Sequence, residues 1–382
     1  MKRSTGKYVT ISTVGEKVNA FVPIPLPPHP PIDWTPVLRE KFDNALVALG
    51  RLDSVSSLLP DTSLFLYMYI RKEAVLSSMI EGTQSSLSDL LLFELGEEPG
   101  VPIDDVQEVS NYVAALKHGI KRLDSGFPIS LRLIKEIHEV LLSKGRGSHK
   151  SPGEFRKSQN WIGGASLKDA KFIPPAHTFI ADLITDLEKF LNNEELHVPH
   201  LIKIGIAHYQ FEAIHPFLDG NGRIGRLLIT LYLVERNILN KPTLYFSDFI
   251  ERNRQHYYTN LSAVSNKGEL VHWLKFFLIG VIETAETAIA TFNKILLLRT
   301  KLESKAIVKL GKKIPKAQQL LAYLFRQPVV NVNDIIKVLK VTKPTANALI
   351  ADFIKLKILK EQTGFKRNRS FHFEAYLKLF GK

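Results

Sequence analysis

The sequence predicts a mainly α-helical protein that carries a β-hairpin on its surface and a small C-terminal winged helix-turn-helix domain. Three observations predict this fold class. Apolar residues recur at three- and four-residue spacing from about Asp33 to Thr300, which is the period of amphipathic helices. Residues 150–176 instead contain two short β-prone runs. After Gly311 the composition shifts and becomes strongly basic, which indicates a separate domain.

Length and composition limit the number of domains and the class of protein. The chain has 382 residues, enough for two or three domains, and its 45% apolar and 23% charged residues are typical of a globular protein. It has no cysteine, which excludes disulfides and cysteine-based zinc sites. No apolar run approaches the length of a signal peptide or a membrane span. We therefore expect a cytoplasmic protein without a membrane partner.

The first segment, residues 1–60, is expected to form an N-terminal strap and the first helix. Residues 23–31 alternate prolines with Ile24 and Leu26, so they cannot form a helix or a central strand. They predict an extended strap packed across the body, because its two apolar side chains favour burial. A ligand for an SH3-type domain is the alternative. The first helix is predicted at Val37–Gly50.

The middle of the chain predicts a helical domain spanning residues 61–300. The expected helices are Leu64–Ile80, Val106–Leu123, Leu131–Leu142, Phe179–Leu191, Leu201–Ile214, Arg223–Val234, and one or two within Leu270–Leu298.

A β-hairpin is predicted within residues 150–176. Trp161-Ile162 and Phe172-Ile173 form its strands, and Gly163-Gly164 lies between them. An exposed hairpin edge can accept a segment of another protein as an added strand. The alternative is a hairpin that only stabilises the body.

The most informative segment is His215-Pro-Phe-Leu-Asp-Gly-Asn-Gly-Arg-Ile-Gly-Arg226. Its glycine-rich loop opens directly into an apolar helix, so backbone N–H groups should be exposed at a helix start, where phosphate oxygens bind. Arg223 and Arg226 add fork-shaped donors for the same anion. His215, with an ordinary pKa near 6.5, suits a general base beside that anion. The alternative is a polar turn between two helices.

This segment resembles the signature of the Fic family, H-P-F-x-[D/E]-G-N-G-R-x-x-R, and every defined position is filled. The resemblance implies a Fic-type helical bundle with residues 61–300 as its catalytic domain and the β-hairpin as a flap over the active site. It also implies transfer of AMP from ATP to a hydroxyl side chain of a target protein, which the flap would align.

The resemblance assigns roles along the motif. His215 would be the general base, and Asp219 would hold Mg²⁺, which needs only one or two carboxylates. The backbone N–H groups of Gly220, Asn221 and Gly222 would cradle the α- and β-phosphates.

The same resemblance places the rest of the motif in the nucleotide site. Arg223 and Arg226 would neutralise the β- and γ-phosphates, and Ile224 and Gly225 lie between them.

Residues 244–258 are expected to form an aromatic-rich helix, and the resemblance implies that this stretch reaches the adenine. We expect Tyr257 to contact the base and its neighbour Tyr258 to lie in the core.

Ser77-Ser-Met-Ile-Glu81-Gly82 resembles the family's inhibitory motif, [S/T]-x-x-x-E-[G/N], at the end of an expected inhibitory helix, 61–82. Ser77 and Glu81 are four residues apart and so share one helix face. The resemblance implies that Glu81 pairs with Arg226 and places a carboxylate in the nucleotide site where the γ-phosphate would bind.

A basic C-terminal domain is predicted at residues 312–382. Residues 301–382 contain 18 Lys and Arg against 5 Asp and Glu, so the whole net charge of +13 lies there. Helices are predicted at Lys316–Phe325, at Asp334–Leu339 capped by Asn331 or Asn333, and after the cap Thr342 with Pro344 in the first turn. Short strands are expected at Leu359–Gln362 and Ser370–Phe373.

This order resembles a winged helix-turn-helix domain and predicts an anionic partner, DNA first. The third helix would offer Lys343, Thr345 and Asn347 to a groove, and the wing would offer basic side chains, Lys366, Arg367 and Arg369, to phosphates. A module that binds another protein is the alternative.

Three functions stay open on the sequence. The first is an autoinhibited protein adenylyltransferase that also modifies itself. The second is a DNA-binding regulator whose Fic domain senses nucleotide. The third is a de-AMPylase that uses the same site, with Glu81 positioning a water. A homodimer contact that tunes inhibition is a further expectation.

Overall fold

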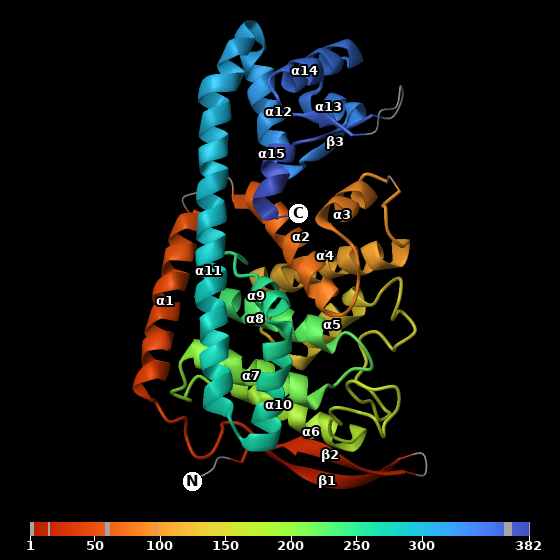
Figure 1. The fold of residues 1–382 in the computed structure, drawn as a ribbon, viewed down its shortest axis with the longest axis vertical. Coiled ribbons are helices and arrows are strands. Elements are labelled where there is room, and N and C mark those ends of the chain that lie inside the picture. Colours follow the sequence, from red (N-terminus) through yellow and green to blue (C-terminus); the bar gives the residue numbers. More distant parts are fainter. Residues whose placement is uncertain (1–3, 14–15, 58–61, 97, 363–368, 382) are drawn as a thin grey trace.

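The computed structural model describes residues 4–13, 16–57, 62–96, 98–362 and 369–381. They form a helical body with a small C-terminal module at one end, and the long helix α11 runs along both (Figure 1). The mainly helical fold class is therefore confirmed. A single buried apolar cluster extends from Phe21 near the N-terminus to Phe380 near the C-terminus.

The helices of the body lie close to the predicted limits, except that the first continues past Gly50 to Ser57 and the helix at Leu87–Glu94 was not predicted. They are α1 (Pro36–Ser57), α2 (Thr62–Ile80), α3 (Leu87–Glu94), α4 (Ile103–Asp124), α5 (Leu131–Leu141), η1 (His177–Phe179), α6 (Ile180–Asn192), α7 (His200–Ile214), α8 (Asn221–Glu235), α9 (Phe246–Arg252), α10 (Arg254–Lys267) and α11 (Leu270–Lys301). The predicted helix at 244–258 is broken at Asn253, and Leu270–Leu298 forms one helix.

The two helices that flank the motif form the centre of the body. Nearly every residue of α7, and most of α8, is buried, so neither helix has a polar face of ordinary width. They pack against each other, and α6 and α11 cover α7. Burial on all sides fixes the axes of both helices, and the loop between them is therefore held at a fixed place.

An N-terminal β-hairpin was not predicted. Strands β1 (Gly6–Thr13) and β2 (Glu16–Pro23) pair antiparallel with Gly6 opposite Pro23. The Thr5 hydroxyl donates to the Val264 carbonyl at 2.6 Å, and the Phe21 N–H donates to the Ile173 carbonyl at 2.9 Å. The hairpin therefore covers α10 and lies beside the predicted flap.

The predicted flap at 150–176 is only partly regular. A single β-bridge joins Ile162 and Phe172, and the rest of the segment is turns and irregular chain. Gly163 and Gly164 both have positive φ, as the predicted turn requires. The two strands proposed from the sequence are therefore reduced to one bridged pair, because side-chain and main-chain bonds to the body replace ladder bonds.

The proline-rich strap packs across the body as predicted. The Leu26 N–H donates to Asp186 Oδ2 at 2.7 Å on α6, and Gln210 Nε2 on α7 donates to the Ile24 carbonyl at 2.9 Å. Leu26 and Ile32 are partly buried against the core.

The C-terminal module follows the order helix, strand, helix, helix, strand, strand, with two short helical segments before this order and two after it. Its elements are η2 (Leu302–Ala306), η3 (Ile307–Lys313), α12 (Ile314–Arg326), β3 (Val329–Asn331), α13 (Val332–Leu339), α14 (Lys343–Lys355), β4 (Lys360–Glu361), β5 (Ser370–His372), α15 (Glu374–Leu377) and η4 (Lys378–Phe380). The strands pair antiparallel in the order β3-β5-β4.

The caps of the module only partly match the prediction. Asn331 caps α13 through a capping box with Asp334. Thr342 occupies the N-cap position of α14, but its side chain makes no cap bond. The predicted wing residues Lys366 and Arg367 lie outside the described residues.

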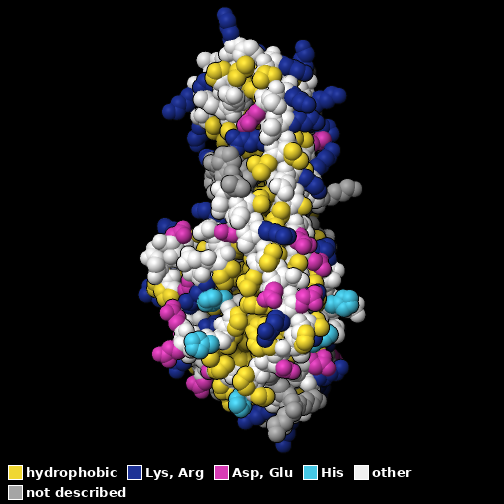
Figure 2. All heavy atoms as spheres, turned by 90° about the vertical axis from the view of Figure 1, so that its left-hand side faces the viewer, with side chains coloured by type: hydrophobic (Ala, Val, Ile, Leu, Met, Phe, Trp, Pro, Cys, Tyr) yellow, Lys and Arg dark blue, Asp and Glu magenta, His cyan; other side chains and the backbone are white. Residues whose placement is uncertain are grey.

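Charge divides the molecule along its length. On the face drawn in Figure 2, Lys and Arg side chains dominate around the C-terminal module, whereas Asp and Glu gather over the helical body. Among the described helices, none is long and apolar enough to span a bilayer.

Candidate nucleotide site

The motif loop joins α7 to α8 through two residues with left-handed backbone. His215 ends α7 with φ 50° and ψ 60°, an uncommon conformation for a residue with a side chain. Gly220 precedes α8 with φ 77°, where the absence of a Cβ removes the strain. The first N–H groups of α8, like those of any helix, have no intrahelical acceptor. No side chain caps them either.

Asn221 closes the loop through its amide group. Asn221 Oδ1 accepts from the Phe217 N–H at 2.8 Å, and Asn221 Nδ2 donates to the Phe217 carbonyl at 2.9 Å. Both the oxygen and the nitrogen of the Asn221 amide are therefore hydrogen-bonded within the loop. Only the backbone of Asn221 is left to bind a ligand.

The predicted inhibitory residues both bind Arg226. Arg226 Nε donates to Ser77 Oγ at 2.9 Å, and Nη2 donates to the Ser77 carbonyl and to Glu81 Oε1, each at 2.8 Å. A Cβ added to Gly222 would lie 2.4 Å from Glu81 Oε1. The carboxylate therefore rests directly on the first turn of α8. Burial opposes its ionisation, but the charge of Arg226 prevails and holds the pKa of Glu81 below its usual value.

Arg223 is engaged by carboxylates. Its Nη1 donates to Glu108 Oε2 at 3.0 Å, and its Nη2 donates to Asp219 Oδ1 at 3.1 Å. Glu108 is buried on α4 and also binds Arg146 at 2.8 Å. Arg223 thus positions Asp219 in this structure, and its contact with phosphate stays a prediction.

Asp219 was predicted to hold Mg²⁺. About 37% of its side chain is exposed, and its Oδ1 also accepts from the Gly220 N–H. Within the described part of the chain, no three His, Asp or Glu side chains are grouped as in a protein-only metal cage. A single, partly exposed carboxylate fits an ion that takes most of its ligands from water and nucleotide phosphates.

His138, to which the sequence analysis gave no role, lies beside Asp219 and contacts its main-chain carbonyl. The Gly153 N–H donates to His138 Nδ1 at 2.8 Å, so Nε2 carries the proton and donates to the Asp219 carbonyl at 3.0 Å. Its ring stacks on Phe217 with centroids 3.7 Å apart. Burial lowers the pKa of His138 to about 4. The ring therefore joins α5, the start of the flap segment, and the motif.

His215 is neutral in this environment. Burial, and next the nearby charge of Arg156, lower its pKa to about 4. Its Nδ1 lies 3.4 Å from the Glu212 carbonyl, a long contact that favours the proton on Nδ1. Nε2 is then left as the unprotonated nitrogen, which is the form a general base requires.

A cavity of about 880 Å³ adjoins these residues. Of the predicted site residues, those that line it are Glu81, His215, Gly222, Arg226 and Tyr257. Trp161, Ile162 and Gly163 of the predicted flap form another part of its wall. Ile224, in contrast, is buried in the core, and Gly225 faces Glu212 and His208.

Of the two tyrosines at 257 and 258, only Tyr258 differs from the prediction. Tyr258 is 43% exposed, so its expected place in the core was wrong. Tyr257 is 1% exposed, and its hydroxyl donates to His208 Nε2 at 2.8 Å. His208 Nδ1 in turn donates to the Gly225 carbonyl at 3.0 Å, which links Tyr257 to the motif helix. Both tyrosines line the cavity, and contact of Tyr257 with adenine stays a prediction.

Glu212 is a carboxyl that the sequence analysis missed. Its Oε1 is buried without a hydrogen-bond partner, beside Gly225 on the cavity wall. Burial raises the pKa of Glu212 to about 8. Its position three residues before His215, on the same side of α7, was the available sequence signal.

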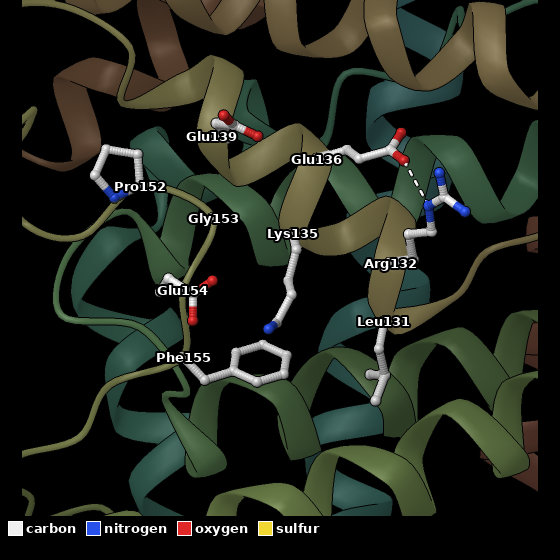
Figure 3. A pocket seen from close by; sticks show the side chains of 9 residues that line it. All are labelled: Leu131, Arg132, Lys135, Glu136, Glu139, Pro152, Gly153, Glu154 and Phe155. Carbon is white, nitrogen blue, oxygen red and sulfur yellow. Dashed lines mark hydrogen bonds and ion pairs between the residues drawn. The ribbon is translucent and has the colours of Figure 1, made fainter.

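A second hollow of about 550 Å³ lies between α5 and residues 152–155. Lys135 extends toward the ring of Phe155, with Nζ 4.7 Å from its centroid (Figure 3). Glu136 is already bound to Arg132 there. The contact of Lys135 with Phe155 links α5 to the start of the flap segment. None of the predicted site residues lines this hollow.

Two family models match this chain, and their matches include the residues described above. Residues 39–121 match the domain described as "Fic/DOC family N-terminal", and residues 128–233 match "Fic/DOC family". The second match contains the whole motif and the flap segment, and the first contains Ser77 and Glu81.

Two relatives are named protein adenylyltransferase Fic. The protein of Aedes aegypti is 30% identical over 204 residues, and that of Culex quinquefasciatus is 30% identical over 201 residues. In each case the match covers 52% of this chain and 37% of the relative. The chain therefore spans less than half the length of the relatives that it matches.

Two solved structures share the fold. A Fic family protein from Desulfovibrio desulfuricans G20 aligns with a TM-score of 0.59 and 20% identity, over 90% of this chain and 98% of its own. A Fic domain containing signaling protein from Bacteroides thetaiotaomicron VPI-5482 aligns with a TM-score of 0.53 and 20% identity, over 65% of this chain and 97% of its own.

Proposed function

The chain belongs to the Fic/DOC family, and from that premise we propose that it is an autoinhibited protein adenylyltransferase. It would transfer AMP from ATP to a Ser, Thr or Tyr hydroxyl of a target protein, or of itself, and release pyrophosphate. The observation that carries this proposal is the contact of Glu81 with both Arg226 and the first turn of α8. An anion of the protein thus occupies an anion-binding helix start beside a neutral histidine.

The proposed reaction is a displacement at phosphorus. The target oxygen bonds to the α-phosphorus, the bond from that phosphorus to the bridging oxygen breaks, and pyrophosphate leaves with the electron pair. His215 takes the hydroxyl proton on its unprotonated Nε2. The N–H groups at the start of α8 and the guanidinium of Arg226 stabilise the phosphate charge.

Asp219 is the residue proposed to hold Mg²⁺, which would neutralise phosphate charge when bound. Arg223 and His138 keep this carboxylate in place through its Oδ1 and its carbonyl. Two neighbouring contacts therefore orient the ligand before any nucleotide arrives.

Inhibition is proposed to be electrostatic competition. Glu81 gives Arg226 a carboxylate in place of a γ-phosphate, and its Oε1 occupies the space over Gly222. ATP that binds while Glu81 remains there would lack the Arg226 contact and would lie in an unproductive position.

The test compares wild type, Glu81→Gly and the double variant with His215→Ala, each incubated with ATP and Mg²⁺ and analysed by intact mass. We expect an added adenylate on Glu81→Gly, little on wild type and none on the double variant. Absence of adenylate on Glu81→Gly and on proteins offered as targets contradicts the transferase proposal. Removal of AMP from a modified protein by wild type, but not by Glu81→Gly, identifies the de-AMPylase instead.

A second candidate function concerns the C-terminal module. Its basic excess and its helix order support binding of DNA. Lys343 and Thr345 are exposed at the start of α14. We expect Lys343→Glu to weaken binding of duplex DNA and to reduce the salt dependence, whereas the exposed Lys241→Glu on the body leaves both unchanged. Equal binding by both variants contradicts a nucleic-acid surface at α14.

A further inference from the structure

Arg156 is a buried guanidinium whose side-chain hydrogen bonds, within the described part of the chain, all go to main-chain carbonyls. It is 3% exposed. Nε donates to the His215 carbonyl at 2.9 Å, Nη1 to Ser158 at 3.0 Å, and Nη2 to Pro175 at 2.6 Å. A buried charge without a carboxylate partner is unfavourable for stability. Burial accordingly lowers the pKa of Arg156 to about 10.

These bonds join two parts of the proposed site. Ser158 and Pro175 lie in the flap segment, one before and one after its Ile162–Phe172 bridge. His215 holds the uncommon left-handed backbone that ends α7, and Arg156 also donates its own N–H to the Pro216 carbonyl at 2.9 Å. A strained backbone persists only where its surroundings hold it. One side chain therefore fixes both the hinge that carries the imidazole and the base of the flap.

We infer that Arg156 is a positioning residue for the general base, holding the His215 hinge against the flap and placing a fixed positive charge beside the imidazole. This inference rests on the proposed function. Charged groups on other elements also face the ring. Glu81 from α2 and Asp219 from the loop raise the pKa of His215, whereas Arg156 lowers it.

The test uses Arg156→Gln and Arg156→Lys, each combined with Glu81→Gly so that transfer is measurable. Transfer rate is recorded against pH, together with thermal unfolding. Arg156→Gln should lower the rate at least tenfold and move the acid limb to higher pH, because the charge is gone. Arg156→Lys should also lower the rate, since a lysine cannot bridge several carbonyls, but should keep the acid limb.

Two results overturn the inference. One is an unmoved acid limb in a folded Arg156→Gln protein, which reduces the residue to a structural role. The other is full activity of Arg156→Lys, which contradicts the positioning role even if the Gln variant does not fold. If Glu81→Gly with Arg156 intact does not transfer AMP, that result contradicts the proposed function and not the role of Arg156.

An independent observation concerns the inhibitory helix. Tyr69, Glu73 and Ser77 recur at four-residue spacing on one side of α2, and Glu81 follows in the turn just beyond its end at Ile80. Ser77 and Glu81 bind Arg226, and Glu73 accepts hydrogen bonds from Tyr112 and Ser247. The same face thus extends from the nucleotide site toward the C-terminal module.

Tyr69, at the far end of this face, meets the C-terminus of the chain. Its ring contacts Phe380 edge-on with centroids 5.3 Å apart, and it stacks on Phe292 of α11 at 4.6 Å. Phe380 contacts Tyr376 within the module at 5.2 Å. Helix α12 of the module also packs against α2, as the adjacent ribbons in Figure 1 show.

We also propose that the C-terminal module holds α2 in its inhibitory position through the contact of Phe380 with Tyr69. Helix α2 runs without a break from that contact to Ile80, and Glu81 follows directly after it. Loss of the aromatic contact should let α2 leave Arg226 more often. This second inference likewise rests on the proposed function.

The test measures AMP transfer by Phe380→Ala, by Phe380→Leu and by the exposed Val338→Ala of the same module as a control. We expect a severalfold rise for Ala, a smaller rise for Leu and none for the control. In the Glu81→Gly background the Ala change should add nothing. No rise in Phe380→Ala while Glu81→Gly is active overturns the proposal, as does a rise that persists without Glu81.

Discussion

Replacing Glu81 by Gln and by Gly separates its charge from its bulk. Glu81 Oε1 and Arg226 Nη2 are 2.8 Å apart, and Arg226 is 1% exposed. A hydrogen bond to a charged group contributes about 1.5–3 kcal/mol, and a neutral one about 0.5–1.5 kcal/mol. Glutamine keeps an acceptor of the same shape for the charged guanidinium and loses only the attraction between two opposite charges, about 1–1.5 kcal/mol for this partly exposed carboxylate.

These energies translate into rates if transfer follows the fraction of molecules in which Arg226 is free. At about 1.4 kcal/mol per factor of ten, Glu81→Gly should transfer AMP roughly 10–150 times faster than wild type. Glu81→Gln should be roughly 5–10 times faster. The assay is incorporation of label from [α-³²P]ATP at fixed protein concentration. A Gln variant as inactive as wild type, beside an active Gly variant, would refute the charge argument and leave only steric obstruction.

The remaining predictions concern other groups of the site. Gly222→Ala should abolish transfer even in the Glu81→Gly background, because the added methyl fills the space over α8 that the phosphates need; retained transfer there contradicts the cradle. Asp219→Asn should raise the Mg²⁺ concentration for half-maximal transfer, and chelation should stop the reaction; an unchanged Mg²⁺ titration removes Asp219 as the ligand. Burial lowers the pKa of His208 to about 4, so the unfolded chain, with an ordinary His pKa near 6.5, binds the proton first. Its contribution to stability is present above pH 6.5 and is lost as the pH falls toward 4. The thermal midpoint should drop over that range, and His208→Gln should reduce the drop; parallel profiles for the two proteins would contradict this assignment.

The periodic helices of the body could be predicted because burial of one face leaves a three- and four-residue pattern in the sequence. The N-terminal hairpin could not, because β1 and β2 depend on support from α10 and from Ile173. The regularity of the flap was overestimated for a related reason. Its two β-prone runs pair only at Ile162 and Phe172, whereas Arg156, Asn160 and Ile173 bond to the rest of the protein, and such bonds leave no periodic trace.

In the site, the sequence by itself determined the uncapped helix start at which we propose that phosphate binds, since Gly220, Asn221 and Gly222 precede an apolar helix. It also paired Ser77 and Glu81 on one helix face through their spacing. Only the tertiary structure decided which groups restrain the motif. Arg156 and Glu108 come from distant segments, and a buried charge is placed by three-dimensional packing rather than by any local pattern. The phase of Tyr257 and Tyr258 was likewise decided by packing, because adjacent helix residues point about 100° apart and only the neighbouring helices choose which side is buried.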